Sequence, residues 1–144
     1  MRLSVRGDYG IRAVLDLAEH YGGGLVQNSG IAARQSIPEP YLHQLLLALR
    51  KSGLVRSVRG PRGGHALARS PQDLTLAEVM EALEGPISQD CSDDVSGCVQ
   101  RDGCALRLVR RGVDQATKRI LSSTTIAQLA KKRGDSSAGS MYHI

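Results

Sequence analysis

The chain has 144 residues, a net charge of +5 and no Trp or Phe, which suits a globular protein with a core of Leu, Ile, Val and Ala. Its four tyrosines are too few for the aromatic platforms on which many RNA-binding proteins stack bases. No apolar run approaches the length of a membrane span and no signal-peptide core is present, so we expect a cytoplasmic protein without membrane contacts.

Charge is distributed in three blocks of alternating sign. Residues 1–72 carry ten Lys and Arg against four Asp and Glu, residues 73–103 carry one against eight, and residues 104–133 carry eight against one. A basic first block is typical of a protein that binds a polyanion such as DNA, or simply of a solvated surface. We take these blocks, followed by a tail at 134–144, as the segments of the chain.

The first block predicts three helices. The stretch DYGIRAVLDLAEHY has apolar residues at helical spacing behind Asp8, which we expect to be the N-cap. A short helix at IAARQ is joined by the turn SIPEP to the helix YLHQLLLALRKSG, whose leucines form an apolar stripe that ends at Gly53. Three helices of this kind predict a helix-turn-helix domain.

A β-hairpin is expected directly after these helices. The stretch LVRSVRGPRGGHALAR alternates apolar and polar residues on both sides of a Gly/Pro turn, which predicts strands at 54–58 and 66–68. The turn lies between strands and lacks the Lys-Ser/Thr end of a P-loop, so we exclude a nucleotide loop. A hairpin in this place is a wing, and the predicted fold class is mainly α: a winged helix-turn-helix with a small β-hairpin, plus a long dimerisation helix.

A winged helix places the helix after the turn in the major groove of DNA. We expect His43 and Gln44 to read bases, Tyr41 to bond phosphate, and Arg59 and Arg62 on the wing to enter a narrow minor groove. For His43 an ordinary exposed histidine is the alternative. The predicted DNA-contacting residues are Arg2, Ser4, Glu39, Tyr41, His43, Gln44, Arg50, Lys51, Arg56, Arg59 and Arg62.

Three more helices are expected beyond the wing. TLAEVMEALE begins with a capping box at Thr75 and Glu78, and a longer helix runs from Cys104 to about Ser122. The longer helix predicts a homodimer, because one face is highly charged and another has a heptad seam, although packing on its own domain is the alternative. That seam consists of Leu106, Val109, Val113, Ala116 and Ile120. TTIAQLAKK predicts a last short helix, and 134–144 a disordered tail.

All three cysteines, Cys91, Cys98 and Cys104, lie in the stretch CSDDVSGCVQRDGC. Their odd number and the expected reducing compartment argue against structural disulfides. The acidic neighbours disfavour a low thiol pKa at the first two cysteines, whereas the position of Cys104 at a helix start would lower its thiol pKa. Metal coordination itself drives thiol deprotonation, so a metal site is favoured over a thiol switch or no site. Thiolates suit both zinc and iron-sulfur clusters.

Three stretches resemble the Rrf-two family of bacterial winged-helix regulators: MRLSVRGDYGIRAVLDLA, IPEPYLHQLLLALRKSGLVRSVRGPRGGHALAR and TLAEVMEALEG. The resemblance runs from residue 1 to about 132. The family includes an iron-sulfur cluster biogenesis regulator, a nitric-oxide-sensing repressor and a cysteine-metabolism repressor. The resemblance implies a homodimer, crossed or swapped at the long helix, that controls transcription. A symmetric dimer would bind double-stranded DNA at a pseudo-palindromic operator. No catalytic constellation is visible, so we do not expect an enzyme.

The cluster-binding branch of this family has three cysteines in the same segment at similar spacings. The resemblance therefore implies that Cys91, Cys98 and Cys104 bind a 2Fe-2S or 4Fe-4S iron-sulfur cluster that senses redox state, iron-sulfur status or nitric oxide, with zinc as the lesser alternative. Some members add a histidine three residues after the last cysteine, but Arg107 stands there. Others use an acidic residue of the other subunit near the start of the first helix, and Asp8 matches that place.

The tail suggests a different form of control. Its ending MYHI is similar to the isoleucine-ending C-termini with which serine acetyltransferase docks into O-acetylserine sulfhydrylase, and the cysteine-metabolism repressor of this family responds through that enzyme. The alternative function is therefore a cluster-free repressor of cysteine or sulfur metabolism that this enzyme controls by docking on the tail. An uninvolved C-terminus is the other interpretation.

Overall fold

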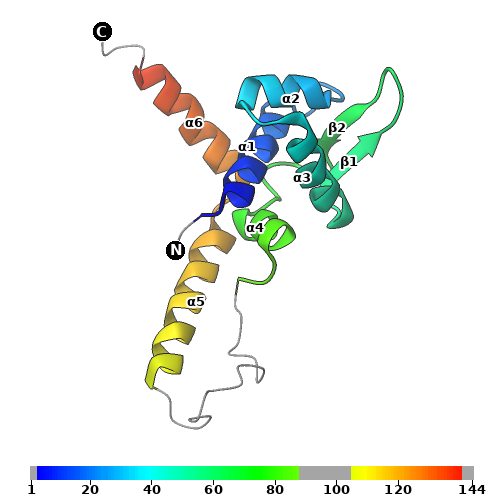
Figure 1. The fold of residues 1–144 in the computed structure, drawn as a ribbon. Helices are drawn as coiled ribbons and strands as arrows, with labels where there is room; N and C mark the ends of the chain where they lie inside the picture. Colours follow the sequence, from blue (N-terminus) through cyan, green and yellow to red (C-terminus); the bar gives the residue numbers. More distant parts are fainter. Residues whose placement is uncertain (1–2, 88–104, 141–144) are drawn as a thin grey trace.

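The computed structural model of the chain describes residues 3–87 and 105–140. Its helices are α1 (Val5–Glu19), α2 (Asn28–Gln35), α3 (Glu39–Lys51), α4 (Leu76–Glu84), α5 (Ala105–Ser123) and α6 (Ile126–Ser140), and its strands are β1 (Val55–Val58) and β2 (Gly64–Leu67). Helices α1 to α4 and the hairpin form one body, from which α5 and α6 extend in two directions (Figure 1). The predicted mainly α fold with one antiparallel hairpin is confirmed.

Helix α1 begins four residues before the predicted start, because Ser4 and not Asp8 is its N-cap. The backbone of Ser4 is extended, and its hydroxyl accepts a hydrogen bond from the amide of Gly7 at 3.0 Å, which satisfies a free donor of the first turn. Asp8 instead lies inside the first turn and pairs with Arg12 one turn later at 2.7 Å. The predicted cap was therefore wrong.

The helix-turn-helix is formed by α2, a short turn and α3. Helix α2 starts at Asn28, before the predicted stretch IAARQ, and ends at Ser36, which has a left-handed backbone with φ of 53°. Helix α3 follows Pro38 and carries the predicted leucine stripe. The buried leucines, Leu42, Leu45, Leu46 and Leu49, pack with α1 and α2 residues in the main core. The helical period of the apolar residues thus located the core side of α3 correctly.

The wing is a short antiparallel hairpin with Ser57 opposite His65. Its turn is tight, because a Cβ atom added to Gly63 would lie 2.1 Å from the carbonyl oxygen of Val58. The backbone of Val26, in the loop before α2, exchanges two hydrogen bonds of 2.8 Å with His65. This bridge was not predicted, and it joins the wing to the helical body.

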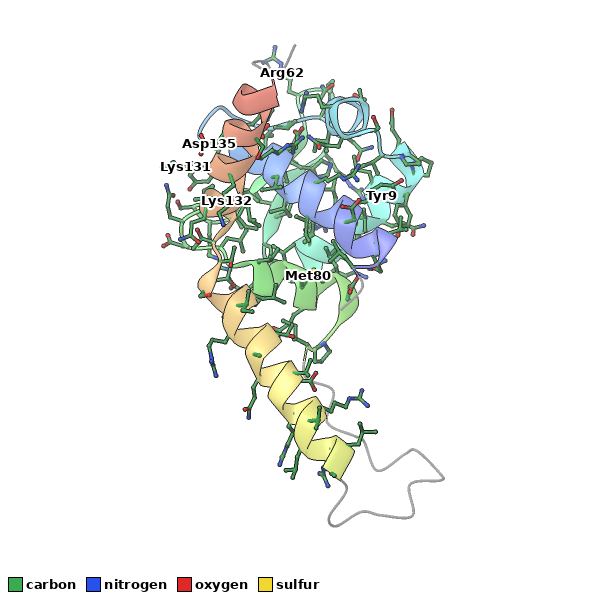
Figure 2. The ribbon with its side chains drawn as sticks, turned by 90° about the vertical axis from the view of Figure 1, so that its left-hand side faces the viewer. Tyr9, Arg62, Met80, Lys131, Lys132 and Asp135 are labelled. Atoms are coloured by element: carbon green, nitrogen blue, oxygen red, sulfur yellow. The ribbon has the colours of Figure 1, made fainter. Side chains whose placement is uncertain are left out.

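Helix α4 has the predicted capping box, in which Thr75 and Glu78 satisfy each other's backbone amides. It packs across α1 and also contacts the C-terminal end of α5, where Leu121 is buried against Met80. Figure 2 shows the rest of α5 leading away from this contact. Among the described helices, none is long and apolar enough to cross a membrane.

Helix α6 includes part of the segment that was predicted to be disordered. It is anchored by Ile126, which is fully buried in the main core, and it continues through Ser140. The prediction of disorder from 134 was wrong for residues 134–140, because a helix already nucleated by packing extends at little cost per residue. The ending MYHI lies outside the described residues.

Candidate nucleic-acid interface and dimer surface

Helix α3 presents a mostly polar face opposite its buried leucines, with the exposed Leu47 in the middle. The residues on this face that were predicted to contact DNA, Glu39, His43, Gln44, Arg50 and Lys51, are all exposed. His43 and Gln44 lie about one turn after Glu39, and Arg50 and Lys51 lie two turns further on, so these side chains share one side of the helix. Because the buried leucines fix the orientation of α3, its polar face points to solvent and is available to bind DNA.

Tyr41 differs from the other predicted residues of α3 because its ring is half-buried. The ring packs edge-to-face against Tyr9 of α1, with centroids 5.8 Å apart and planes at 74°. The guanidinium of Arg12 lies 5.6 Å from the centre of the Tyr9 ring. Aromatic pairs of this geometry are stabilising, so the tyrosines fix the first turn of α3 on α1. A phosphate contact by Tyr41 stays a prediction.

The wing adds exposed cations to the same part of the molecule. Arg56 on β1 and Arg59 and Arg62 in the turn are all exposed. The turn reaches well beyond the helical body (Figure 1). We call α3's polar face and these three arginines the basic surface; its predicted residues include five Lys and Arg but only one carboxylate, Glu39. Such a surface attracts a polyanion.

The Ser57 and His65 pair of the wing lies close to His43 and Arg50 of α3. His65 and Ser57 face each other across the hairpin, with Nδ1 and Oγ 2.8 Å apart. Burial lowers the pKa of His65, and the charges of His43 and Arg50 lower it further. Burial and these neighbours thus both favour the neutral form of His65.

A buried carboxylate on α1 holds α2 in place, and sequence reasoning missed it. Asp16 is fully buried and accepts two hydrogen bonds from Arg34, at 2.7 and 2.9 Å, and one from Gln35 at 2.8 Å. Burial raises the pKa of Asp16, but the bonds from Arg34 and Gln35 hold it below its ordinary value. The signal in the sequence was an aspartate inside the apolar stretch VLDLA.

The predicted dimer seam is exposed in the single chain. Leu106, Val109, Val113 and Ile120 are 59 to 73% exposed, and Ala116 is exposed as well. Leu108, which was not predicted, is also 73% exposed. By contrast, the side of α5 that carries Leu121 packs on α4. Exposed apolar side chains gathered along one face of a helix, as the five seam residues are, indicate an interaction surface.

Most of the predicted metal ligands lie outside the described residues. These are Cys91, Cys98 and Cys104, and the same holds for Arg2 among the predicted DNA contacts. Asp8 has a side chain that is 40% exposed and paired with Arg12. Within residues 3–87 and 105–140, no three potential ligands form a metal-binding group.

The hydroxyl of Ser4 makes hydrogen bonds within the protein and is therefore not free. Besides capping α1, it donates a hydrogen bond to Glu84 at the end of α4. Next to it, Nε of Arg6 donates to the carbonyl oxygen of Leu83 at 2.6 Å. The start of α1 is therefore bonded to the end of α4. Contact between Ser4 and DNA stays a prediction.

Comparison with known proteins assigns this architecture to transcriptional regulators. Residues 3–132 match the family model Rrf2, described as an iron-dependent transcriptional regulator. The HTH-type transcriptional regulator IscR of Xenorhabdus nematophila is 36% identical over 92% of this chain and 81% of its own. The regulator CymR of Bacillus subtilis is 33% identical over the full length of both chains.

Two solved structures agree with this result. The structure of CymR, titled the global cysteine regulator of B. subtilis, has a TM-score of 0.78 and covers 92% of this chain and 98% of its own. The IscR of T. potens is 38% identical with a TM-score of 0.77, and covers 92% and 88%. The fold is thus that of a winged-helix transcriptional regulator, which is not an enzyme. The chain belongs to the Rrf2 family.

Proposed function

We propose that the protein is a homodimeric DNA-binding regulator whose affinity for its operator depends on an iron-sulfur cluster held by Cys91, Cys98 and Cys104. The observation that carries the proposal is the place of the cysteine segment in the chain. It connects Ile87, just after α4, to Ala105, the first residue of α5. One flanking helix is bonded to the DNA-binding domain and the other carries the exposed seam.

The exposed seam supports a homodimer. Apolar side chains at heptad spacing are costly in water, and a second copy of the same helix covers them with matching residues. A two-fold dimer of winged helices presents two basic surfaces to successive turns of the DNA major groove. A pseudo-palindromic operator follows from that symmetry.

A contiguous set of contacts connects the end of α4, which precedes the cysteine segment in the chain, with the recognition helix. The end of α4 is bonded to the start of α1 through Leu83 and Arg6. One turn later, Tyr9 of α1 packs against Tyr41 in the first turn of α3. A change at the cysteine segment that moves α4 would therefore be transmitted through α1 to the end of α3 that enters the groove.

The donor set suits an iron-sulfur cluster. Three cysteine thiolates within fourteen residues are the ligands that such clusters take, and the cluster supplies a centre that oxidation or nitric oxide modifies. A fourth ligand is needed. Our candidate is the Asp8 carboxylate, which is half-exposed and pairs with Arg12. To bind the cluster, Asp8 must release Arg12.

Anaerobic purification tests the proposal. We expect a coloured protein with iron and sulfide in equal amounts and little zinc. Replacing any of the three cysteines by serine should remove the colour, whereas Ser96→Ala, a matched change within the same segment, should keep it. Operator binding is then compared between the cluster-loaded and metal-free protein. A colourless, metal-free protein that binds the same operator with unchanged affinity would contradict the proposal.

A second candidate is a cluster-free repressor of sulfur metabolism controlled by O-acetylserine sulfhydrylase. The full-length match to CymR favours it, since both chains align from end to end. Truncation of Ser140 to Ile144, followed by measurement of sulfhydrylase binding, tests this alternative. Binding that is lost on truncation, in a protein without iron, would favour it over the cluster.

A further inference from the structure

A cavity of about 400 Å³ lies between α1, α2 and α6, and the proposed DNA-binding and sensing roles do not use it. It is lined by Arg12, Leu15, Arg34, Gln35, Ser36 and Arg133. Three of these are arginines from three different helices, and none is a carboxylate. The volume falls in the range of small-molecule sites. The cavity wall therefore offers cationic hydrogen-bond donors, each of which also pairs with a carboxylate, Asp8, Asp16 or Glu19.

Each arginine of the cavity is held in place by a partner that leaves some of its donors unused. Arg12 uses Nη2 for Asp8 at 2.7 Å, and Arg34 uses Nε and Nη2 for Asp16. Arg133 uses Nη2 for the side-chain oxygen of Gln35 at 3.0 Å. A guanidinium has more donors than these contacts occupy. The groups are thus oriented in advance, which reduces the entropy lost on ligand binding.

One donor of Arg133 has no acceptor within the described residues. Nη1 of Arg133 is buried and makes no hydrogen bond within the described part of the chain. The carboxylate of Glu19 is its ion-pair partner, but the oxygen lies 4.0 Å away, too far for a hydrogen bond. A buried donor on a charged group is costly to leave unpaired. A rotation of the guanidinium that turns Nη1 toward the cavity would let an anionic oxygen of a bound ligand satisfy it.

We propose that this cavity binds a small dianion, either inorganic phosphate or the phosphate group of a small metabolite. Arginine pairs with phosphate through parallel hydrogen bonds that are shorter and stronger than neutral ones. The bound anion would bridge α6 to α2, next to the Ser36 turn that leads into α3. Ligand binding would in this way hold α6, which follows α5 directly in the chain, against the helix-turn-helix.

Titration with inorganic phosphate tests the proposal without any DNA. Binding is measured by calorimetry on the full chain at constant ionic strength, with chloride as the balancing anion. We expect saturable binding to the wild type, weakened at least about tenfold by Arg133→Gln or Arg12→Gln. Lys132→Gln removes the same charge from the neighbouring, exposed position of α6, outside the cavity, and should bind as the wild type does.

Two results of the phosphate titration would contradict the proposal. Absence of phosphate-specific binding to the wild type, or equal affinity in Arg133→Gln, would overturn the proposal. Should Arg133→Gln fail to fold, Arg12→Gln decides, because the contacts of Arg12, an ion pair with Asp8 and a stacking contact with Tyr9, are partly exposed.

A DNA backbone phosphate is chemically the same group, so duplex binding is measured in phosphate-free buffer. We expect Arg133→Gln and Lys132→Gln to bind DNA with equal affinity. A selective loss of DNA affinity in Arg133→Gln, without phosphate binding to the wild type, would assign the cavity to the DNA interface and overturn the small-ligand proposal.

Discussion

The carboxylate of Asp16 on α1 and the guanidinium of Arg34 on α2 are joined by two parallel hydrogen bonds, Oδ1 to Nη2 at 2.7 Å and Oδ2 to Nε at 2.9 Å. The carboxylate is fully buried, whereas the arginine side chain is 43% exposed. Gln35 supplies a third bond to the same carboxylate and accepts one from Arg133 of α6. A single buried group thus sets the positions of three helices.

Replacing Asp16 by alanine should destabilise the fold by about 2–3 kcal/mol. The variant leaves Gln35 without its buried acceptor and creates a small void, while Arg34 regains water because it is partly exposed. Urea unfolding followed by circular dichroism measures the loss. Glu81→Ala removes an exposed carboxylate of α4, outside this network, and should change stability by less than about 0.5 kcal/mol. Equal effects of the two changes would show that the network does not hold α2.

The same network makes stability depend on pH. The pKa of Asp16 is lower in the folded state than in the unfolded chain, because its partners favour the ionised carboxylate. Ionisation of Asp16 therefore stabilises the fold. This contribution is complete above about pH 4 and is lost as the pH falls through the depressed folded-state pKa. Glu78 contributes with the same sign, since bonds to Arg69 and Thr75 outweigh the effect of burial on its pKa.

Urea midpoints measured between about pH 7 and pH 3 should therefore decrease less in Asp16→Asn than in the wild type. Glu78→Gln is the control that keeps the contribution of Asp16. A wild-type decrease that Asp16→Asn leaves unchanged would mean that other carboxylates carry the acid sensitivity.

Local patterns predicted those parts of the fold that depend on neighbours in the sequence. The leucines of α3 repeat at helical spacing, and Thr75 and Glu78 of the capping box stand three residues apart. The sequence alone was therefore enough to locate both features. The α1 cap was misassigned because Ser4 and Asp8 are both good caps, and the choice depends on the contact of Ser4 with Glu84, eighty residues away.

Contacts between distant segments were beyond sequence reasoning. Val26 pairs with His65, and the arginines of the anion cavity come from positions 12, 34 and 133. No spacing rule relates such positions, because the fold alone brings them together. The polar face of α3 was predictable for the opposite reason, since it is what remains once the leucine stripe is buried.

Val113→Glu should convert the proposed dimer into monomers. The side chain is 59% exposed in the single chain, so the charge does not disturb the fold of one protomer, but in a paired helix it would be buried opposite its own copy. Light scattering coupled to size-exclusion chromatography gives the mass. Gln115→Glu adds the same charge at an exposed position of α5 beside the seam and should remain dimeric. A wild-type monomer, or a dimeric Val113→Glu, would place the interface elsewhere.

Arg59→Ala and Arg62→Ala should each weaken DNA binding and reduce its salt dependence. Each arginine that neutralises one phosphate contributes about −0.9 to the slope of log affinity against log salt concentration. Fluorescence anisotropy over a salt series measures this slope on the same duplex. Lys131→Ala, an exposed cation of α6 outside the basic surface, is the control and should leave the slope unchanged (Figure 2). Unchanged slopes in both wing variants would show that the wing does not touch the DNA backbone.

Gly63→Ala should distort the wing and lower DNA affinity without unfolding the helical body. A Cβ at this position would lie 2.1 Å from the carbonyl oxygen of Val58 and 2.9 Å from that of Gly60, so the backbone of the turn must move. We expect a stability loss of about 1–3 kcal/mol, as for other overpacked sites. Gly134→Ala is the matched control, because nothing lies within 4 Å of its added methyl group and alanine favours the helix.

The distortion should stay local, because the wing residues that pack in the main core, Val55 and Leu67, lie at the opposite end of the hairpin from the turn. DNA affinity should therefore fall more than far-ultraviolet helicity, and fluorescence anisotropy and circular dichroism on the same preparation measure the two. A Gly63→Ala protein with wild-type DNA affinity would show that the turn tolerates a side chain or that the wing takes no part in binding.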